Sequence, residues 1–142
     1  MTQKNKELLL RDLCCRLPYG VKCSFGVDDA IYEITGINPT CCGASEIQAT
    51  HIKSSINGDF SLSSCKPYLF PLSSMTEEQR EEYKSLCIKE TSERADFYGI
   101  IFSQDYYYDT VESIDFLYKN HIDIRGLIPK GLAIDTTNLN IY

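Results

Sequence analysis

The segment NHIDIRGLIPKGLAID, residues 120–135, places two cations beside two glycines in a spacing that resembles a phosphate-binding loop. Gly126 and Gly131 match the two glycines of the G-x-x-x-x-G-K-[ST] pattern, in which backbone N–H groups surround the phosphate oxygens. The alternative interpretation is structural. In that interpretation Gly126 ends the preceding helix, and the apolar residues of the segment pack against the core: Leu127, Ile128, Leu132 and Ile134.

The segment departs from the phosphate-loop pattern at the positions that its chemistry requires. Leu132 follows the second glycine, where the pattern needs a lysine, and Lys130 precedes that glycine. Pro129 removes one of the backbone donors on which such a loop depends. We therefore exclude a nucleotide-hydrolysing loop, and we retain Arg125 and Lys130 as candidate contacts for an anion.

Three consecutive tyrosines in the sequence DYYYD, residues 105–109, form a second candidate site. Neighbouring side chains cannot all point to one face of an element, so we expect at least one ring to be exposed or to lie at an interface. Tyrosine rings are common at recognition surfaces, and aromatic rings stack on nucleobases. The structural alternative divides the three rings between the core and an ordinary surface.

The sequence offers no recognisable set of residues for catalysis or metal binding. Two pairs of cysteines are directly adjacent, and adjacent side chains diverge on a helix or a strand, so these pairs are poor chelators. Nothing in the sequence ties His51 or His121 to a thiol. His121 is placed at a helix C-terminus, which favours the charged imidazolium, and we therefore expect it to have a structural role. We expect no catalytic residue, no metal and no cofactor; a site assembled from distant segments stays open as the alternative.

The bulk composition favours one folded domain that stays in the cytoplasm. The chain has 142 residues, of which 43% are hydrophobic and 24% charged, and its net charge is −6. An acidic chain is a poor general nucleic-acid binder, because neutralising phosphates requires a basic face. No apolar run approaches the length of a membrane span or a signal peptide. We therefore expect reduced thiols, no general nucleic-acid binding and no membrane insertion.

The first half of the chain predicts one helix followed by short strands. A leucine stripe favours a helix over residues 4–16, which Pro18 ends. Asn57 and Gly58 suit the positive φ of a hairpin turn. Residues 66–72, KPYLFPL, contain two prolines and predict an extended exit at a sheet edge. Apolar residues alternate over four short segments, which we expect to be strands: 21–25, 30–37, 46–52 and 60–65.

The second half of the chain predicts helices. In residues 73–94 two pairs have capping-box spacing, Ser74 with Glu77 and Thr76 with Gln79, and glutamates follow early, which favours one long helix. Residues 97–103 form a short apolar strand or buried link, and a further helix begins near Asp109 or Thr110. The fold class is therefore α+β: an N-terminal helix and a small antiparallel sheet or SH3-like barrel within residues 1–72, then a helical part, 73–142, packed on it as one compact unit.

Three motifs recur together in a known group of proteins. The sequences DLCCRLPYGVK, KPYLFPLSSMTEEQ and FLYKNHIDIRGLIPKGLAIDTTNLNIY occur here in that order. With this pattern the chain resembles a group of small uncharacterised proteins that phages and integrated mobile elements of gut bacteria carry. The resemblance covers about half of the chain, and segments 25–65 and 88–108 fall outside it. It implies an accessory protein that is expressed in an infected or lysogenised bacterium.

Two functions agree with these features. The first is a non-enzymatic protein that sequesters a small nucleotide-like signal and so counters a host defence. The alternative is a protein-interaction module that binds and inhibits a host protein, and either function is compatible with a homo-oligomer. In the first function one tyrosine stacks on a base and lysine or arginine side chains contact phosphates; the candidate ligand-binding residues are Tyr106, Tyr107, Tyr108, Arg125, Lys130 and Lys66.

Overall fold

A computed structural model describes residues 1–26, 30–38, 46–95 and 101–142, with the side chains of 94, 95, 101 and 102 left out. The chain opens with helix α1, Gln3–Arg16, where the hydroxyl of Thr2 accepts a hydrogen bond from the backbone N–H of Asn5 at 3.2 Å. A 3₁₀ turn, Leu17–Tyr19, follows directly and contains the proline that limits the helix. The predicted helix over residues 4–16 is confirmed.

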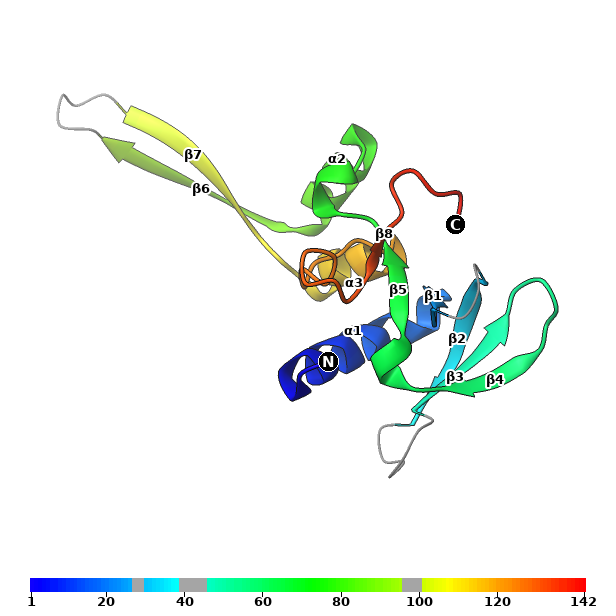
Figure 1. The fold of residues 1–142 in the computed structure, drawn as a ribbon. Coiled ribbons are helices and arrows are strands. Elements are labelled where there is room, and N and C mark those ends of the chain that lie inside the picture. Colours follow the sequence, from blue (N-terminus) through cyan, green and yellow to red (C-terminus); the bar gives the residue numbers. More distant parts are fainter. Residues whose placement is uncertain (27–29, 39–45, 96–100) are drawn as a thin grey trace.

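A six-stranded sheet forms the centre of the molecule (Figure 1). Its order is β4-β3-β2-β1-β5-β8, and all neighbours are antiparallel except β5 and β8. The α+β class is confirmed, whereas a barrel is not shown, because the order of strands begins at β4 and ends at β8. The strands are β1 Lys22–Ser24, β2 Tyr32–Ile37, β3 Ile47–His51, β4 Asn57–Phe60, β5 Lys66–Leu69 and β8 Ile134–Asp135.

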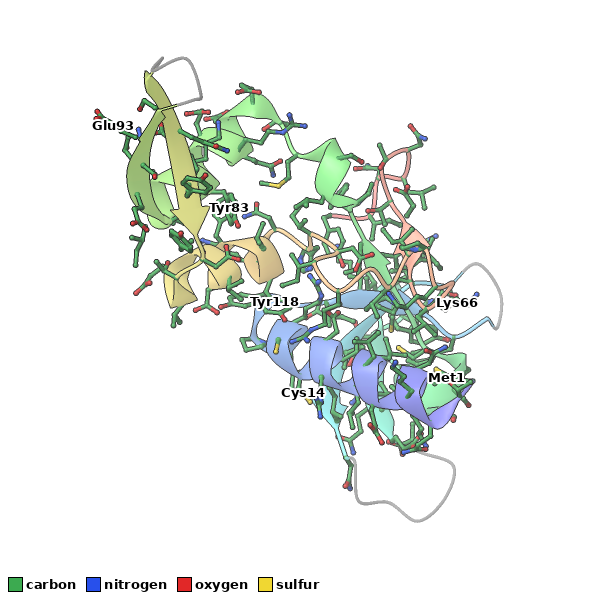
Figure 2. The ribbon with its side chains drawn as sticks, turned by 90° about the vertical axis from the view of Figure 1, so that its left-hand side faces the viewer. Met1, Cys14, Lys66, Tyr83, Glu93 and Tyr118 are labelled. Atoms are coloured by element: carbon green, nitrogen blue, oxygen red, sulfur yellow. The ribbon has the colours of Figure 1, made fainter. Side chains whose placement is uncertain are left out.

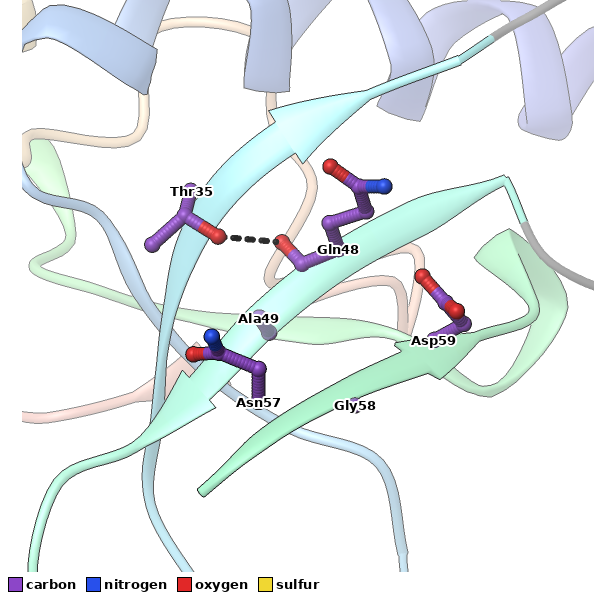
Figure 3. Close-up of a pocket in the computed structure, with 6 residues that line it drawn as sticks. All are labelled: Thr35, Gln48, Ala49, Asn57, Gly58 and Asp59. Carbon is purple, nitrogen blue, oxygen red and sulfur yellow. Dashed lines mark hydrogen bonds between the residues drawn. The ribbon is translucent and has the colours of Figure 1, made fainter. Parts of the chain in front are cut away.

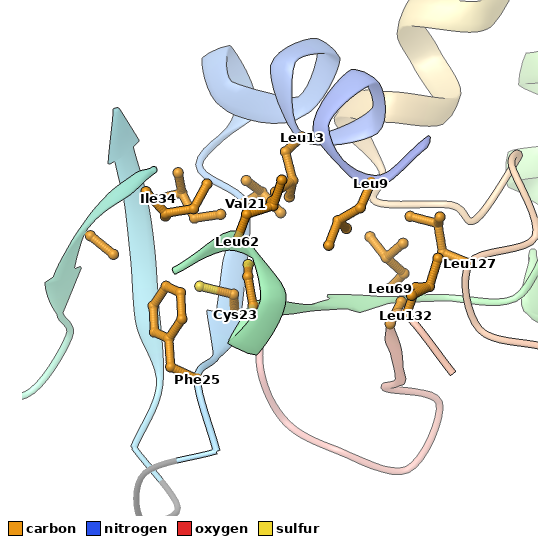
Figure 4. Packing of buried hydrophobic residues seen from close by; sticks show 14 residues of the cluster. Leu9, Leu13, Val21, Cys23, Phe25, Ile34, Leu62, Leu69, Leu127 and Leu132 are labelled. Atoms are coloured by element: carbon orange, nitrogen blue, oxygen red, sulfur yellow. The ribbon is translucent and has the colours of Figure 1, made fainter. Parts of the chain in front are cut away.

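Helix α1 packs its leucine stripe on one face of this sheet (Figure 4). Leu9 and Leu13 are fully buried against side chains from β1, β5 and the 3₁₀ turn Leu62–Ser64. Burying a leucine stabilises a fold by roughly 1.5–3 kcal/mol. The predicted packing of segment 120–135 is confirmed in part: Leu127 and Leu132 join the same core and Ile128 packs against it, whereas Ile134 lies in β8 and is not part of this cluster.

Two predictions about the sheet are wrong. Asn57 and Gly58 lie inside β4, and the turn falls earlier, where Ser55 has a φ of 56°. Strand β4 needs a residue without a side chain at Gly58, because an added Cβ would lie 2.8 Å from the ring of Phe60. The second wrong prediction is a separate strand over residues 60–65. Strand β4 ends at Phe60, and a 3₁₀ turn follows.

Strand β5 is not an edge. It lies between β1 and β8, with Pro67 opposite Cys23 and Tyr68 opposite Ile134. Sequence reasoning expected its prolines to exclude an interior position. The strand is interior only because a two-residue strand from the far end of the chain, β8, pairs with it.

The predicted long helix over 73–94 is also wrong beyond residue 86. Helix α2, Glu77–Leu86, begins with the expected capping box between Thr76 and Gln79, after a 3₁₀ turn at Leu72–Ser74. The chain then extends into β6, Ile88–Ala95, which pairs with β7, Ile101–Tyr108. The aromatic residues of β7 favour a strand. Cross-strand pairs stabilise β6 and β7, whereas a longer helix would have only a thin apolar seam to stabilise it.

Helix α3, Val111–Lys119, begins where the sequence predicted, with Thr110 as its N-cap. Helices α2 and α3 share a second apolar cluster that includes Met75, Phe116 and Ile122. Beyond this cluster β6 and β7 project from the body as a two-stranded ribbon (Figure 1). No helix in the described ranges is long and apolar enough to cross a membrane.

A buried ion pair joins α1 to the segment after α3. The Nε of Arg16 lies 2.6 Å from the carboxylate of Asp12, and both side chains are fully buried. A terminal nitrogen of Arg16 also donates to the carbonyl of Ile122 at 2.7 Å. The Arg16 guanidinium lies over the ring of Tyr118, 4.9 Å from its centre, and Figure 2 shows Tyr118 beside α1.

Replacing Asp12→Ala should lower the free energy of unfolding by about 3–5 kcal/mol, because it leaves the Arg16 charge buried and unpaired. Chemical denaturation measures the change. The control Asp115→Ala removes an exposed carboxylate on α3 and should stay within about 0.5 kcal/mol. Adding Arg16→Met to the Asp12→Ala variant should recover part of the loss. Equal stability of the Asp12→Ala and Asp115→Ala variants would contradict the role of this ion pair.

Candidate functional site

A basic pocket lies between α1 and the loop that contains Arg125 and Lys130. Its volume is about 270 Å³. Four cations and one carboxylate are among its lining residues, in a chain whose net charge is −6. The pocket is therefore a local exception to the acidic average. The lining residues are Lys4, Asn5, Glu7, Leu8, Arg11, Arg125 and Lys130.

Helix α1 supplies one wall through its periodicity. Lys4, Leu8 and Arg11 stand four and three residues apart, so they lie on one face of the helix, beside the stripe that packs on the sheet. Lys4 and Arg11 are exposed. Within the described part of the chain neither side chain has a hydrogen bond or an ion pair. Both cations are thus available to a ligand.

Arg125 forms the opposite wall and is held in place by its neighbours. Its Nε donates to the hydroxyl of Tyr118 at 3.1 Å and lies 3.6 Å from a carboxylate oxygen of Asp12. About a third of the side chain, 32%, is exposed. Arg125 therefore connects the pocket to the buried ion pair of α1 while keeping part of its guanidinium accessible.

Lys130 folds back over its own loop. Its ammonium donates to the carbonyls of Gly126 at 2.9 Å and Arg125 at 3.3 Å. Gly126 has a φ of 65°, and a Cβ there would lie 3.0 Å from this ammonium. The expectation that Gly126 ends the preceding helix is wrong, because α3 ends at Lys119. Gly126 instead makes the bend that brings Arg125 and Lys130 to one side.

Asp123 fixes the shape of the loop from inside. Its carboxylate accepts hydrogen bonds from the backbone N–H groups of Leu127 and Ile128, each at 2.8 Å. These two donors are therefore occupied and do not face an anion. The loop thus differs from a phosphate cradle, in which backbone N–H groups contact the ligand. Any anion in this pocket meets side-chain cations.

The structure brings together only part of the predicted site. Arg125 and Lys130 line the basic pocket, whereas the tyrosines of β7 and Lys66 do not. Tyr107 and Tyr108 are 44% and 51% exposed on the ribbon. Lys66 lies on the side of the molecule away from the ribbon (Figure 2).

Tyr106 is half-buried, and its hydroxyl donates to the side chain of Gln104 at 3.1 Å. Sequence reasoning missed Lys4 and Arg11. The helical spacing of those two residues was visible in the sequence, but their nearness to Arg125 was not.

Two other hollows lie on the sheet and lack clustered cations. One, of about 260 Å³, is lined by polar side chains of β2, β3 and β4, and Figure 3 shows the contact of 3.4 Å from the Thr35 hydroxyl to the carbonyl of Gln48. The other, of about 300 Å³, is lined in part by Tyr32, His51 and Phe60. Nδ1 of His51 accepts from the backbone N–H of Ser54 at 3.0 Å, which makes a local turn.

The cysteines that the structure describes carry no recognisable chemistry. A hydrogen bond with Cys65, together with burial, raises the pKa of the Cys23 thiol, which keeps it protonated. Cys41 and Cys42 lie outside the described residues. In the described ranges no group of three or more potential ligands could hold a metal ion.

His121 has the structural role that the sequence predicts, but not the charge that a helix C-terminus would favour. Its ring is buried and stacks on Tyr142 with 3.8 Å between ring centres. Burial, together with the charges of Arg16 and Lys22, lowers its pKa to about 4. His121 is thus neutral at neutral pH and has a structural role.

Comparison with known proteins adds no assignment to the pocket. No family model matches the chain, and no curated protein or solved structure matches it either.

Replacing Gly126→Ala should cost more stability than Gly131→Ala. Both glycines have φ values near 65–70°, and a left-handed conformation costs a residue with a side chain about 1–2 kcal/mol. Only at Gly126 does the new methyl group also displace Lys130. Denaturation curves measure both changes. Equal losses would show that the Lys130 contact contributes nothing.

Stability should fall as His121 is forced to protonate. The folded pKa is about 4 against an ordinary 6.5, so between these values the unfolded chain binds a proton that the folded chain does not. Lowering the pH from 7 to 4 should remove on the order of 3 kcal/mol through this residue. His121→Asn, which tolerates positive φ, should lose less stability over the same range. Parallel pH profiles would contradict this expectation.

Proposed function

We propose that the protein binds and sequesters a small, phosphate-bearing ligand of the nucleotide type in the basic pocket. One observation carries the proposal: Lys4, Arg11, Arg125 and Lys130 converge on a single hollow of an otherwise acidic chain. Lysine and arginine are the side chains that recognise phosphate, and arginine can do so through two parallel hydrogen bonds. The convergence of four such residues favours a ligand with more than one negative charge.

The pocket combines two fixed cations with two available ones. Arg125 and Lys130 are held by hydrogen bonds to Tyr118 and to loop carbonyls, so little conformational entropy is lost when a ligand arrives. Lys4 and Arg11 lie on the facing helix with no partner in the described ranges. A ligand phosphate between the two walls would replace the mutual repulsion of these charges by attraction.

The composition of the pocket favours binding without catalysis. The volume of about 270 Å³ lies just below the usual range for small-molecule pockets. Leu8 offers an apolar contact, and Glu7 is the single carboxylate among the described lining residues. One carboxylate among cations gives no acid–base pair. The tyrosines of β7 do not line this pocket, so the proposal assigns them no stacking role.

The choice of a signalling nucleotide as the ligand comes from context. The motifs LPYGV, KPYL and RGLI resemble a group of phage and mobile-element proteins, and small accessory proteins of that kind often act by binding. A host defence signal is a suitable target for sequestration. This part of the proposal rests on the resemblance alone.

Native mass spectrometry of the protein purified from bacterial cells tests the proposal directly. A bound molecule of nucleotide mass, released on denaturation, would identify the ligand and its stoichiometry. Pyrophosphate then serves as a defined probe in calorimetric titration. Absence of a bound nucleotide, together with no pyrophosphate binding at millimolar concentration, would refute the assignment.

Arg11→Gln should weaken pyrophosphate binding about tenfold, the equivalent of ~1.4 kcal/mol, because it removes one charge-assisted contact. The protein should keep its melting temperature, since Arg11 is exposed and has no partner within the described residues. The matched control is Lys53→Gln, which removes one exposed charge outside the pocket. Equal affinity of the two variants would show that only net charge matters.

A protein-interaction module is the second candidate function, and the projecting ribbon favours it. Tyr107, Tyr108 and Ile88 are exposed at its base, with Ile88 62% exposed. Exposed aromatic residues are frequent at protein interfaces. A host protein that the native chain captures, and that a Tyr107→Ala, Tyr108→Ala variant releases, would favour this function over ligand binding.

A further inference from the structure

Among the residues that the structure describes, no strand pairs with either outer edge of the ribbon of β6 and β7. Each strand pairs only with the other, and the ladder runs without interruption from Ile88 opposite Tyr108 to Ala95 opposite Ile101. An isolated pair of strands is marginally stable in water. An open edge also presents unpaired N–H and C=O groups to another strand. In β6 neither a proline nor a bulge blocks such pairing.

One face of β6 carries a charge pattern that is complementary to itself. Lys89, Thr91 and Glu93 alternate along the strand and so point to one face. Lys89 forms an ion pair with Asp105 of β7 at 2.8 Å, and the hydroxyl of Thr91 donates to the same carboxylate at 2.8 Å. Glu93 is exposed and has no ion-pair partner among the described residues.

We propose that a second copy of this chain pairs antiparallel with β6 along its open edge, with the two-fold axis at Thr91. In this register Lys89 of each copy lies opposite Glu93 of the other, so two intermolecular ion pairs form on one face. Each Lys89 then lies between Asp105 of its own chain and Glu93 of the second copy. The two ribbons become one four-stranded antiparallel sheet.

Other pairings of the same edges set different residues opposite each other, and the experiment separates them. An axis at Glu90 sets this carboxylate opposite its own copy, and pairing of two β7 strands about Asp105 does the same there; like charges directly opposite destabilise a sheet. Pairing of β6 with β7 of another copy does not close and would extend into a filament. An axis at Ser92 sets Glu90 opposite Arg94 and leaves Lys89 opposite Ala95. A dimer in that register would persist in both variants changed at 89 or 93, and this outcome would contradict the proposed register.

This inference is independent of the proposed anion site. The residues that line the basic pocket come from α1 and the loop at Arg125, and none belongs to β6. Loss of ligand binding would therefore leave the pairing intact, and the reverse also holds.

A charge exchange between two variants tests the register. Chains with Lys89→Glu carry two negative charges at these positions, and chains with Glu93→Lys carry two positive ones. In each variant alone, like charges face each other between the two copies. The dissociation constant of its dimer should therefore be at least about tenfold higher than that of the native dimer. Mixed in equal amounts, they should form a heterodimer, because both facing positions are again of opposite charge. Sedimentation velocity on the full chain measures all four samples.

The native chain should sediment as a dimer at concentrations in the micromolar range. A native chain that stays monomeric throughout this range would overturn the proposal. So would two variants that dimerise like the native chain, or a mixture that remains monomeric while each variant keeps the native melting temperature. Recovery of the dimer on mixing also shows that both variants are folded.

Discussion

The buried ion pair of Asp12 and Arg16 is the interaction on which the arrangement of α1 depends. Both charges are removed from water, and one guanidinium nitrogen of Arg16 remains without a hydrogen-bond partner among the described residues. Such a pair stabilises a fold little compared with apolar residues, but it is intolerant of misplacement. Its contact with the carbonyl of Ile122 fixes α1 relative to the loop that follows α3. The two walls of the basic pocket are therefore set by one polar contact inside the core.

Arg125 extends this network from the core to the surface. It contacts Asp12 and Tyr118 on one side and lines the pocket on the other. An anion in the pocket would compete with Asp12 for the same guanidinium. The site and the core thus share a residue, whereas the ribbon is anchored elsewhere, where the Thr110 hydroxyl donates to the carbonyl of Leu86 at 2.8 Å.

Local signals in the sequence predicted the elements whose causes are local. The leucine stripe of α1 and the caps at Thr76 and Thr110 depend on residues within one or two turns, and all three features appear in the structure. The end of α2 was mispredicted because β6 forms by pairing with a strand that begins at residue 101. Nothing between 88 and 94 reveals that partner.

The candidate site was only half predictable for a similar reason. Arg125 and Lys130 attract attention as neighbours in sequence, five residues apart. Lys4 and Arg11 reach the same pocket from more than a hundred residues away, and an exposed cation on a helix carries no sign of what faces it. The periodicity of a sequence does not show which distant segments pair or which surfaces face each other in the fold.

The length of the ribbon has a geometric consequence. Eight residues per strand extend about 26 Å at the usual rise of a strand. A rotation of ten degrees at the base therefore displaces the far end of the strands by about 5 Å, while residues beside the base hardly move. The orientation of the base, where α2 and α3 meet, therefore determines the position of every residue along the edge of the ribbon.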